Sequence, residues 1–271
     1  MNTQMKIAIL GGGNLGRAIA NGLQSAKITK PENIYITRKN INHLSYYQEQ
    51  GFKVTRDNKK AVRESQVIII AVQPQQLDEL LSEMKTELQP EYHIIISVVS
   101  GVNIKAIKRQ VGENIPVVRA MPNTAIAIQQ SMTCLASVNN SNRELNIAKK
   151  IFSSVGKTII INEELMVPAT ALGACGIAFF MRAIRAASQG GIEIGFHSEE
   201  ALLIAAQTAK GAATLLLDKK NHPETEVDKV TTPRGCTISG LNEMEHNGFS
   251  SALIRGIVTS ADKANVLYSS D

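Results

Sequence analysis

The first part of the chain alternates short apolar runs, rich in β-branched residues, with segments of helical periodicity. The apolar runs occupy residues 6–10, 33–37, 52–54, 66–72, 93–99, 115–120 and 156–161. Strands that alternate with helices form a mostly parallel sheet whose two faces are both covered by helices. The pattern therefore predicts an α/β fold for residues 1–162.

Beyond Asn162 the strand-like runs stop, and apolar residues recur at helical spacing, as at Phe179, Phe180 and Ile184. We expect residues 163–271 to be entirely helical. Residues 201–217 are Ala-rich and apolar on more than one face, which does not suit a lone surface helix. We therefore expect this part to pack against a second copy of the chain, as a homodimer or a dimer-based higher homo-oligomer.

A glycine-rich turn joins the first expected strand to the first expected helix. Gly11, Gly13 and Gly16 fit the pattern GxGxxG, with Asn14 and Leu15 between the last two. In a Rossmann-type fold these glycines permit a tight turn, let the backbone approach a pyrophosphate and let helix and strand pack closely. The phosphates then lie at the helix N-terminus. The motif predicts a dinucleotide-binding domain, with a purely structural turn as the alternative.

The end of the second strand indicates which dinucleotide is bound. Domains that bind NAD usually carry an acidic residue there, whereas this chain has Thr37, Arg38 and Lys39. Arg38 can pair with a ribose 2′-phosphate, while Thr37 supplies a hydroxyl and Lys39 a further charge. We therefore expect NADPH, with NADH possible; the alternative is a solvated basic turn.

A later strand end should face the same cofactor, because ligands of such sheets bind outside the carboxyl ends of the strands. Its residues are Ala71, Val72, Gln73 and Pro74, and the same argument applies to residues 97–101 at the end of another strand; each segment could equally be an ordinary turn.

Composition argues against several other classes of protein. The net charge is +5, but the basic residues form no block and only 4% of residues are aromatic, which disfavours nucleic-acid binding. The three cysteines and five histidines show no disulfide or metal-ligand spacing. We find no apolar run near the ~20 residues of a membrane helix, and Met1–Lys6 leaves no room for a signal peptide. A soluble, cytoplasmic protein without a metal is expected.

A loop rich in hydroxyl groups, Pro and Gly precedes a helix that we expect to begin near Thr237. The loop contains Thr232, Pro233, Arg234, Gly235 and Cys236. The first amides of a helix have no intrahelical partner, so they can hold a small anion. A threonine at a helix start can also be a simple N-cap, worth about 1 kcal/mol.

This loop resembles the signature of the pyrroline-5-carboxylate reductase family, which reads roughly V-T/S-S-P-G-G-T/A-T. Further matching stretches are residues 7–16, residues 71–74, residues 119–124, and Gly190 and Gly191 with Gly195. The resemblance therefore covers nearly the whole chain. It implies a reductase that converts 1-pyrroline-5-carboxylate to L-proline with NAD(P)H, built from a Rossmann domain and a helical domain that interleaves with a second subunit.

The resemblance also implies roles for individual residues. Thr237 would hydrogen-bond the imine nitrogen and assist its protonation, the amides of Gly235, Cys236 and Thr237 would hold the substrate carboxylate, and Thr232 would add a hydroxyl. Pro122 and Asn123, with Met121 beside them, would border the nicotinamide, and Val72 and Pro74 the rest of the cofactor pocket.

The chain departs from the family pattern at three places. Arg234 stands where the family has the first Gly of a pair, Ala125 where a Pro often follows Asn-Thr, and residues 173–177 where Ser-Gly-Ser-Gly-Pro is usual. Arg234 either pairs with the substrate carboxylate or is a solvated loop residue. The altered 173–177 segment leaves the details of the carboxylate pocket open.

Two other functions compete with this interpretation. A 3-hydroxyacid dehydrogenase would share the glycine turn and the helical second half, but it needs a catalytic Lys on the first long helix, and residues 164–187 contain none. A non-catalytic dinucleotide-binding regulator would keep the fold and lose the reaction. Retention of Thr237 and of residues 121–124 argues against the regulator, whereas the altered segment 173–177 keeps this alternative open.

Overall fold

The computed structural model describes residues 5–138 and 143–268 of the chain. The described residues form two compact units. The first unit contains the residues up to Cys175 together with those from Ser260 onward, and the second is Gly176–Thr259. A change of character also occurs earlier, because the last strand among the described residues ends at Ile160 and every element from Glu163 to Tyr268 is helical. A domain boundary at residue 162 remains a prediction.

The first unit is built on one sheet of eight strands in the order β3-β2-β1-β4-β5-β6-β7-β8. Every neighbouring pair is parallel except β6 and β7. The strands are β1 Ile7–Leu10, β2 Ile34–Thr37, β3 Lys53–Thr55, β4 Val67–Ile70, β5 Ile94–Ser97, β6 Val117–Met121, β7 Ser131–Ser137 and β8 Gly156–Ile160. The predicted α/β class, with a mostly parallel sheet, is confirmed.

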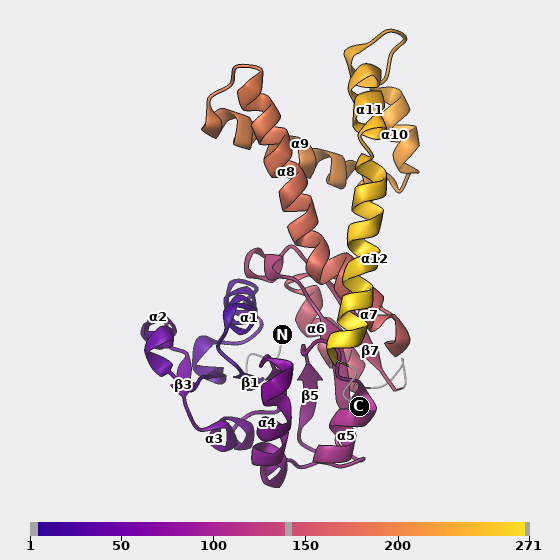
Figure 1. The fold of residues 1–271 in the computed structure, drawn as a ribbon. Helices are drawn as coiled ribbons and strands as arrows, with labels where there is room; N and C mark the ends of the chain where they lie inside the picture. The colour runs from indigo at the N-terminus through magenta and orange to yellow at the C-terminus, as the bar shows by residue number, and fades with distance from the viewer. Residues whose placement is uncertain (1–4, 139–142, 269–271) are drawn as a thin grey trace. The chain divides into compact units, whose positions relative to one another are not determined.

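Helices cover both faces of this sheet (Figure 1). They are α1 Asn14–Ser25, α2 Ser45–Glu49, α3 Asn58–Arg63, α4 Leu77–Met84, α5 Ile104–Val111 and α6 Arg143–Ser153, with short 3-10 turns that include η3 Pro74–Gln76 and η5 Thr124–Ile128. Helices α1 and α6 pack on one face, and α3, α4 and α5 on the other. Because helices cover both faces, the strands β1, β2, β4 and β5 are buried along their whole length, and their sequences are continuous or nearly continuous apolar runs.

Strand β7 was not predicted from the sequence. Its residues include Ser131 and Thr133, which lack the β-branched apolar character of the other runs, yet both are buried. Their burial is possible because the hydroxyl of Ser131 accepts a hydrogen bond from the Asn123 amide at 3.1 Å and lies 3.2 Å from the Thr133 hydroxyl. Paired polar groups can therefore occupy a core strand without showing an apolar pattern.

The remaining elements are helices. They are η6 Glu163–Leu165, α7 Met166–Ala169, the π-helix η7 Thr170–Cys175, α8 Gly176–Glu193, α9 Ser198–Lys219, α10 Pro223–Lys229, α11 Cys236–His246 and α12 Phe249–Tyr268. Helices α8 and α9 pack against each other, and Gly191 permits their close approach because a Cβ there would lie 3.0 Å from the Cβ of Ala201. The predicted helical character of this part is confirmed.

The second unit exposes many large apolar side chains, including Ile194 at 78% and Leu203 at 70%. The stretches Glu163–Glu193 and Ser198–Lys219 are long and apolar enough to cross a membrane by length and composition alone. This finding corrects the expectation that no segment approaches that length. It is weak evidence for a membrane span, since a helix that another protein surface covers passes the same test.

Candidate functional site

A pocket of about 480 Å³ opens at the carboxyl ends of strands β1 to β4 in the first unit. The strand order reverses between β1 and β4, which is the position where doubly wound sheets bind ligands. The pocket volume lies in the ordinary range for a small-molecule site. Its lining comprises Gly11, Gly12, Gly13, Thr37, Arg38, Lys39, Asn40, Arg56, Asn58, Ala71, Val72, Gln73, Gln76, Glu79, Leu80 and Glu83.

The turn after β1 can be built only with glycine at two positions. Gly11 has a φ of +114°, and a Cβ there would lie 2.4 Å from the carbonyl oxygen of Ala71. A Cβ on Gly16 would lie 2.0 Å from the carbonyl oxygen of Gly11. These two glycines therefore hold the first helix tightly against the strands, as the motif predicted.

Gly13 differs, because a Cβ there would meet nothing within 4 Å. It is the N-cap of α1 in an extended conformation, with no side-chain capping hydrogen bond. The amides of Asn14, Leu15 and Gly16 make no hydrogen bond within the described residues. The turn therefore presents unpaired N–H groups next to open space, which is the arrangement that a phosphate requires.

The basic residues after β2 lie on the same pocket wall. The half-buried Arg38 donates from Nη1 to the carbonyl oxygen of Gly12 at 2.8 Å, which ties its guanidinium to the glycine turn. Lys39 is exposed, and its Nζ lies 3.5 Å from Oε2 of Glu79 on α4. Thr37 is buried and lines the pocket.

The pocket thus gathers Gly11, Gly13, Thr37, Arg38, Lys39, Ala71, Val72 and Gln73 from the predicted cofactor site. Asn14, Leu15, Gly16 and Pro74 adjoin these residues in the chain but are not part of the lining. Met121, Pro122 and Asn123 also lie outside it.

Residues that sequence reasoning missed complete the wall. Arg56 and Asn58 follow β3, while Glu79 and Glu83 lie on α4. Asn58 donates from Nδ2 to Oε2 of Glu83 at 2.8 Å. The β3 run was recognised in the sequence, so extending the strand-end argument from β2 to β3 would have found Arg56.

The segment after β6 is held in place by several polar contacts. Asn123 caps η5 by accepting from the Ala125 amide at 3.1 Å, and it donates from Nδ2 to the Gly173 carbonyl oxygen at 3.4 Å. Gly173 belongs to the π-helix η7, in the segment where the chain departs from the family pattern. Met121 is buried in a small cluster with Ala136 and Met166, so its side chain packs in the core.

On β6, Arg119 is 4% exposed and donates from Nη1 to Oε1 of Glu163 at 3.3 Å. Burial lowers the pKa of Arg119, and the neighbouring Glu163 carboxylate opposes this shift. The same oxygen of Glu163 accepts from the Ile104 amide at 2.7 Å. Glu163 therefore ties β6 to the first turn of α5.

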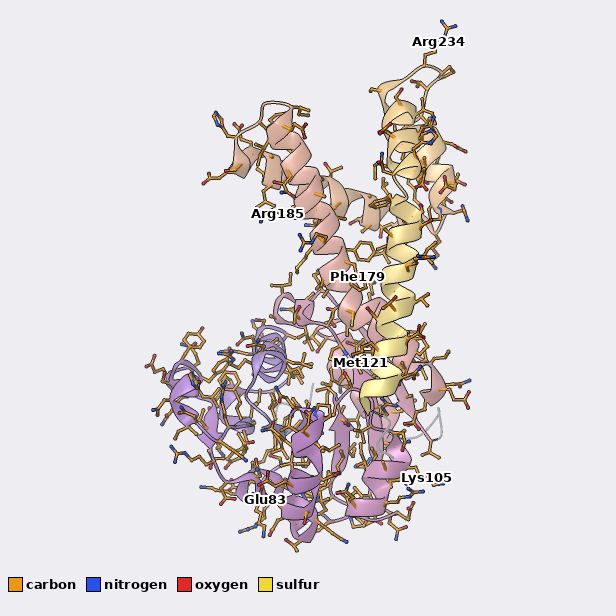
Figure 2. The ribbon with its side chains drawn as sticks, in the orientation of Figure 1. Glu83, Lys105, Met121, Phe179, Arg185 and Arg234 are labelled. Atoms are coloured by element: carbon orange, nitrogen blue, oxygen red, sulfur yellow. The ribbon has the colours of Figure 1, made fainter. Side chains whose placement is uncertain are left out.

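In the second unit, residues 232–235 form a tight turn in front of α11. The Gly235 amide donates to the Thr232 carbonyl oxygen at 2.9 Å, Pro233 occupies the second position, and Arg234 has a φ of +60°. This combination suits a type II turn, in which glycine is preferred at the third position. This preference for glycine at a positive φ explains why the family usually has glycine at the position that Arg234 occupies here. Figure 2 shows the Arg234 side chain pointing away from the loop.

Helix α11 begins at Cys236, with Gly235 as its N-cap and no side-chain capping bond. The N-cap interpretation of Thr237 therefore does not hold, because Thr237 is the second helical residue and its hydroxyl has no hydrogen-bond partner in the described structure. The Gly235 amide is already used by the turn, which removes it from the three amides expected to be available. The amides of Cys236, Thr237 and Ile238 have no partner in this part of the structure.

Comparison with family models finds two matches along the chain. Residues 6–101 match the model described as NADP oxidoreductase, coenzyme F420-dependent. Residues 163–267 match the model described as pyrroline-5-carboxylate reductase dimerisation.

Individual proteins are similar over nearly the whole chain. Pyrroline-5-carboxylate reductase 1 of Dictyostelium discoideum is 56% identical over 97% of the chain, which spans 50% of that relative's length. Pyrroline-5-carboxylate reductase 2 of the same organism is 46% identical, with 98% of the chain and 94% of the relative covered. The crystal structure of Plasmodium falciparum pyrroline carboxylate reductase with NADP bound matches with a TM-score of 0.89 and 25% identity, covering 98% of this chain and 99% of that one.

Proposed function

The chain belongs to the pyrroline-5-carboxylate reductase family, and we propose that the glycine turn of one subunit and the 232–237 loop of its partner together form the active site. The protein is an NAD(P)H-dependent oxidoreductase that reduces the C=N bond of 1-pyrroline-5-carboxylate to give L-proline. The observation that carries the proposal is that two helix N-termini, one after Gly13 and one after Gly235, have no side-chain cap and present free amides to an anion.

The residues around the first pocket fit a dinucleotide. Glycine is required at Gly11 and Gly16, because an added Cβ would lie 2.4 Å and 2.0 Å, respectively, from a backbone carbonyl oxygen. Gly13 instead borders open space that a side chain would fill. In our proposal the amides of Asn14, Leu15 and Gly16 hold the pyrophosphate, and Ala71, Val72 and Gln73 line the path from the adenosine toward the nicotinamide.

When bound, NAD(P)H supplies the hydride. The protein's task is then to place the electrophilic carbon of the substrate, to exclude water and to keep the imine nitrogen protonated. Pro122 and Asn123 border the nicotinamide in this proposal, with Met121 supporting them from the core. The capping bond and the Gly173 contact of Asn123 would fix that border.

The substrate carboxylate would be held at the N-terminus of α11. The amides of Cys236 and Thr237 are available for this role, whereas the Gly235 amide maintains the turn that orients them. A Cβ on Gly235 would lie 2.4 Å from the Thr232 hydroxyl oxygen and 3.0 Å from the Thr232 carbonyl oxygen, so a larger residue there would displace the Thr232 side chain. Thr232 and Arg234 would add a hydroxyl and a positive charge beside the same carboxylate.

Thr237 is the proposed catalytic residue. Its hydroxyl has no structural partner, so it is free to hydrogen-bond the imine nitrogen and to hold the proton that this nitrogen needs during hydride transfer. A Thr237→Val enzyme should fold with unchanged stability and lose about a hundredfold in kcat. Thermal denaturation measures the stability, and a steady-state assay of NADPH absorbance measures kcat. A variant with full kcat would show that Thr237 does not assist protonation of the imine nitrogen.

We further propose that NADPH is preferred to NADH. Arg38 and Lys39 line the pocket, and no carboxylate follows β2 directly. Arg38→Asp should shift the ratio of the two KM values toward NADH, and an unchanged ratio would remove Arg38 from the site.

The protein forms a dimer-based assembly, in keeping with the match of residues 163–267. We propose that the exposed apolar side chains of α8, α9 and α12 contact a second subunit, and that the protein is soluble and cytoplasmic. Sedimentation at micromolar concentration tests the assembly, since a monomer mass would contradict it. Incubating pure protein with pyrroline-5-carboxylate and each reduced cofactor separates this function from a hydroxyacid dehydrogenase or a non-catalytic regulator.

A further inference from the structure

We propose that Arg56 determines cofactor specificity by forming, with Arg38 and Lys39, a three-cation grip on the ribose 2′-phosphate of NADPH. The inference rests on the proposed function, because it takes the pocket beside the glycine turn as the site of the adenosine end. The sequence assigns Arg38 and Lys39 to this role, and the pairing of β2 with β3 adds Arg56 at the same level.

The register of β2 and β3 sets this juxtaposition. Thr37 pairs with Thr55 in parallel, so Arg38 and Arg56 leave neighbouring strands at the same level. The Arg38 amide continues the ladder by donating to the Thr55 carbonyl oxygen at 3.3 Å. Both side chains then line one pocket.

The three cations differ in what already holds them. Arg38 is tied to the Gly12 carbonyl oxygen, and Lys39 lies 3.5 Å from Glu79 in an exposed pair of the kind that contributes little. The exposed Arg56 makes no hydrogen bond or ion pair with any described residue. Its planar guanidinium is therefore free to bind a phosphate through two parallel hydrogen bonds.

The charges of the pocket lining indicate why a third cation is needed to give the wall a net positive charge. The charged residues of the lining are Arg38, Lys39 and Arg56 against Glu79 and Glu83. Without Arg56 the two carboxylates would offset the two remaining cations, and the wall would carry no net positive charge for a phosphate. With Arg56 the wall has a net charge of +1, counted as three cations less two carboxylates.

The test is a calorimetric titration of the purified protein with 2′,5′-ADP and with 5′-AMP, which differ only in the 2′-phosphate. Wild type should bind 2′,5′-ADP more tightly. Arg56→Gln should weaken the binding of 2′,5′-ADP by about tenfold or more, because the charged hydrogen bonds of the guanidinium are lost, and should leave the affinity for 5′-AMP within about twofold. Arg56→Lys should recover part of the loss. Arg109→Gln, which removes an equally exposed arginine outside the pocket, should change neither affinity.

Steady-state kinetics should agree, with a raised KM for NADPH, an unchanged KM for NADH and an unchanged kcat in Arg56→Gln. The proposal is overturned if Arg56→Gln weakens both nucleotides equally or neither of them. If wild type does not distinguish the two nucleotides, the NADPH preference fails together with this inference. Turnover of pyrroline-5-carboxylate by the same preparation would then show that the reductase function itself stands.

Discussion

The open space beside Gly13 allows the cofactor site to be tested without disturbing the fold, through the substitution Gly13→Ser. Gly13 has a φ of −76° and a ψ of −164°, a conformation that serine adopts readily as an N-cap. A Cβ at this position would meet no atom within 4 Å. The substitution should therefore leave the free energy of unfolding unchanged or raise it by a few tenths of a kcal/mol, because serine is the better cap.

The effect on cofactor binding should be large. The serine side chain would occupy the space left for the pyrophosphate, and its hydroxyl would take one of the amides of α1 that have no other partner. A hydrogen bond to a charged group is worth about 1.5 to 3 kcal/mol, so the dissociation constant of NADPH should rise about ten- to a hundredfold. Chemical denaturation and a fluorescence titration with NADPH measure the two quantities on one preparation.

Gly16→Ser provides the matched comparison. A Cβ there would lie 2.0 Å from a backbone carbonyl oxygen, so this variant should lose both stability and cofactor binding. If Gly13→Ser instead binds NADPH as wild type does, the turn is only structural, and the assignment of the pyrophosphate to α1 is wrong.

Other substitutions test features away from that turn. Arg234→Gly should raise the free energy of unfolding by about 0.5 to 1 kcal/mol, because glycine adopts the φ of +60° without strain. The same substitution should raise the KM for pyrroline-5-carboxylate, and an unchanged KM would show that Arg234 is a solvated loop residue. Buried His93 accepts from the Gln89 amide through Nδ1 at 2.9 Å, and burial lowers its pKa below 6.5. The unfolded chain therefore takes up this proton first, so the contribution of His93 to stability is complete above about pH 6.5 and is lost as the pH falls toward the folded-state pKa. Urea denaturation from pH 7.5 to 5.5 should show a shallower decline of stability in His93→Gln than in wild type, and equal slopes would contradict this account.

Features that local chemistry encodes could be predicted from the order of the residues alone. Periodicity separated the α/β part from the helical part, and the glycine spacing located the turn, because only glycine tolerates the φ of Gly11 and the contact at Gly16. The family signature likewise picked out the loop before α11. Each of these follows from residues that are neighbours in the chain.

Other features depend on groups that are distant in sequence, and these emerged only from the folded chain. Strand register placed Arg56 beside Arg38, and paired hydroxyls allowed the polar strand β7 to be buried. The turn before α11 consumed the Gly235 amide and left the Thr237 hydroxyl without a capping role. These outcomes depend on which donor meets which acceptor after the chain has folded, and side-chain patterns along a single strand or helix do not encode that choice.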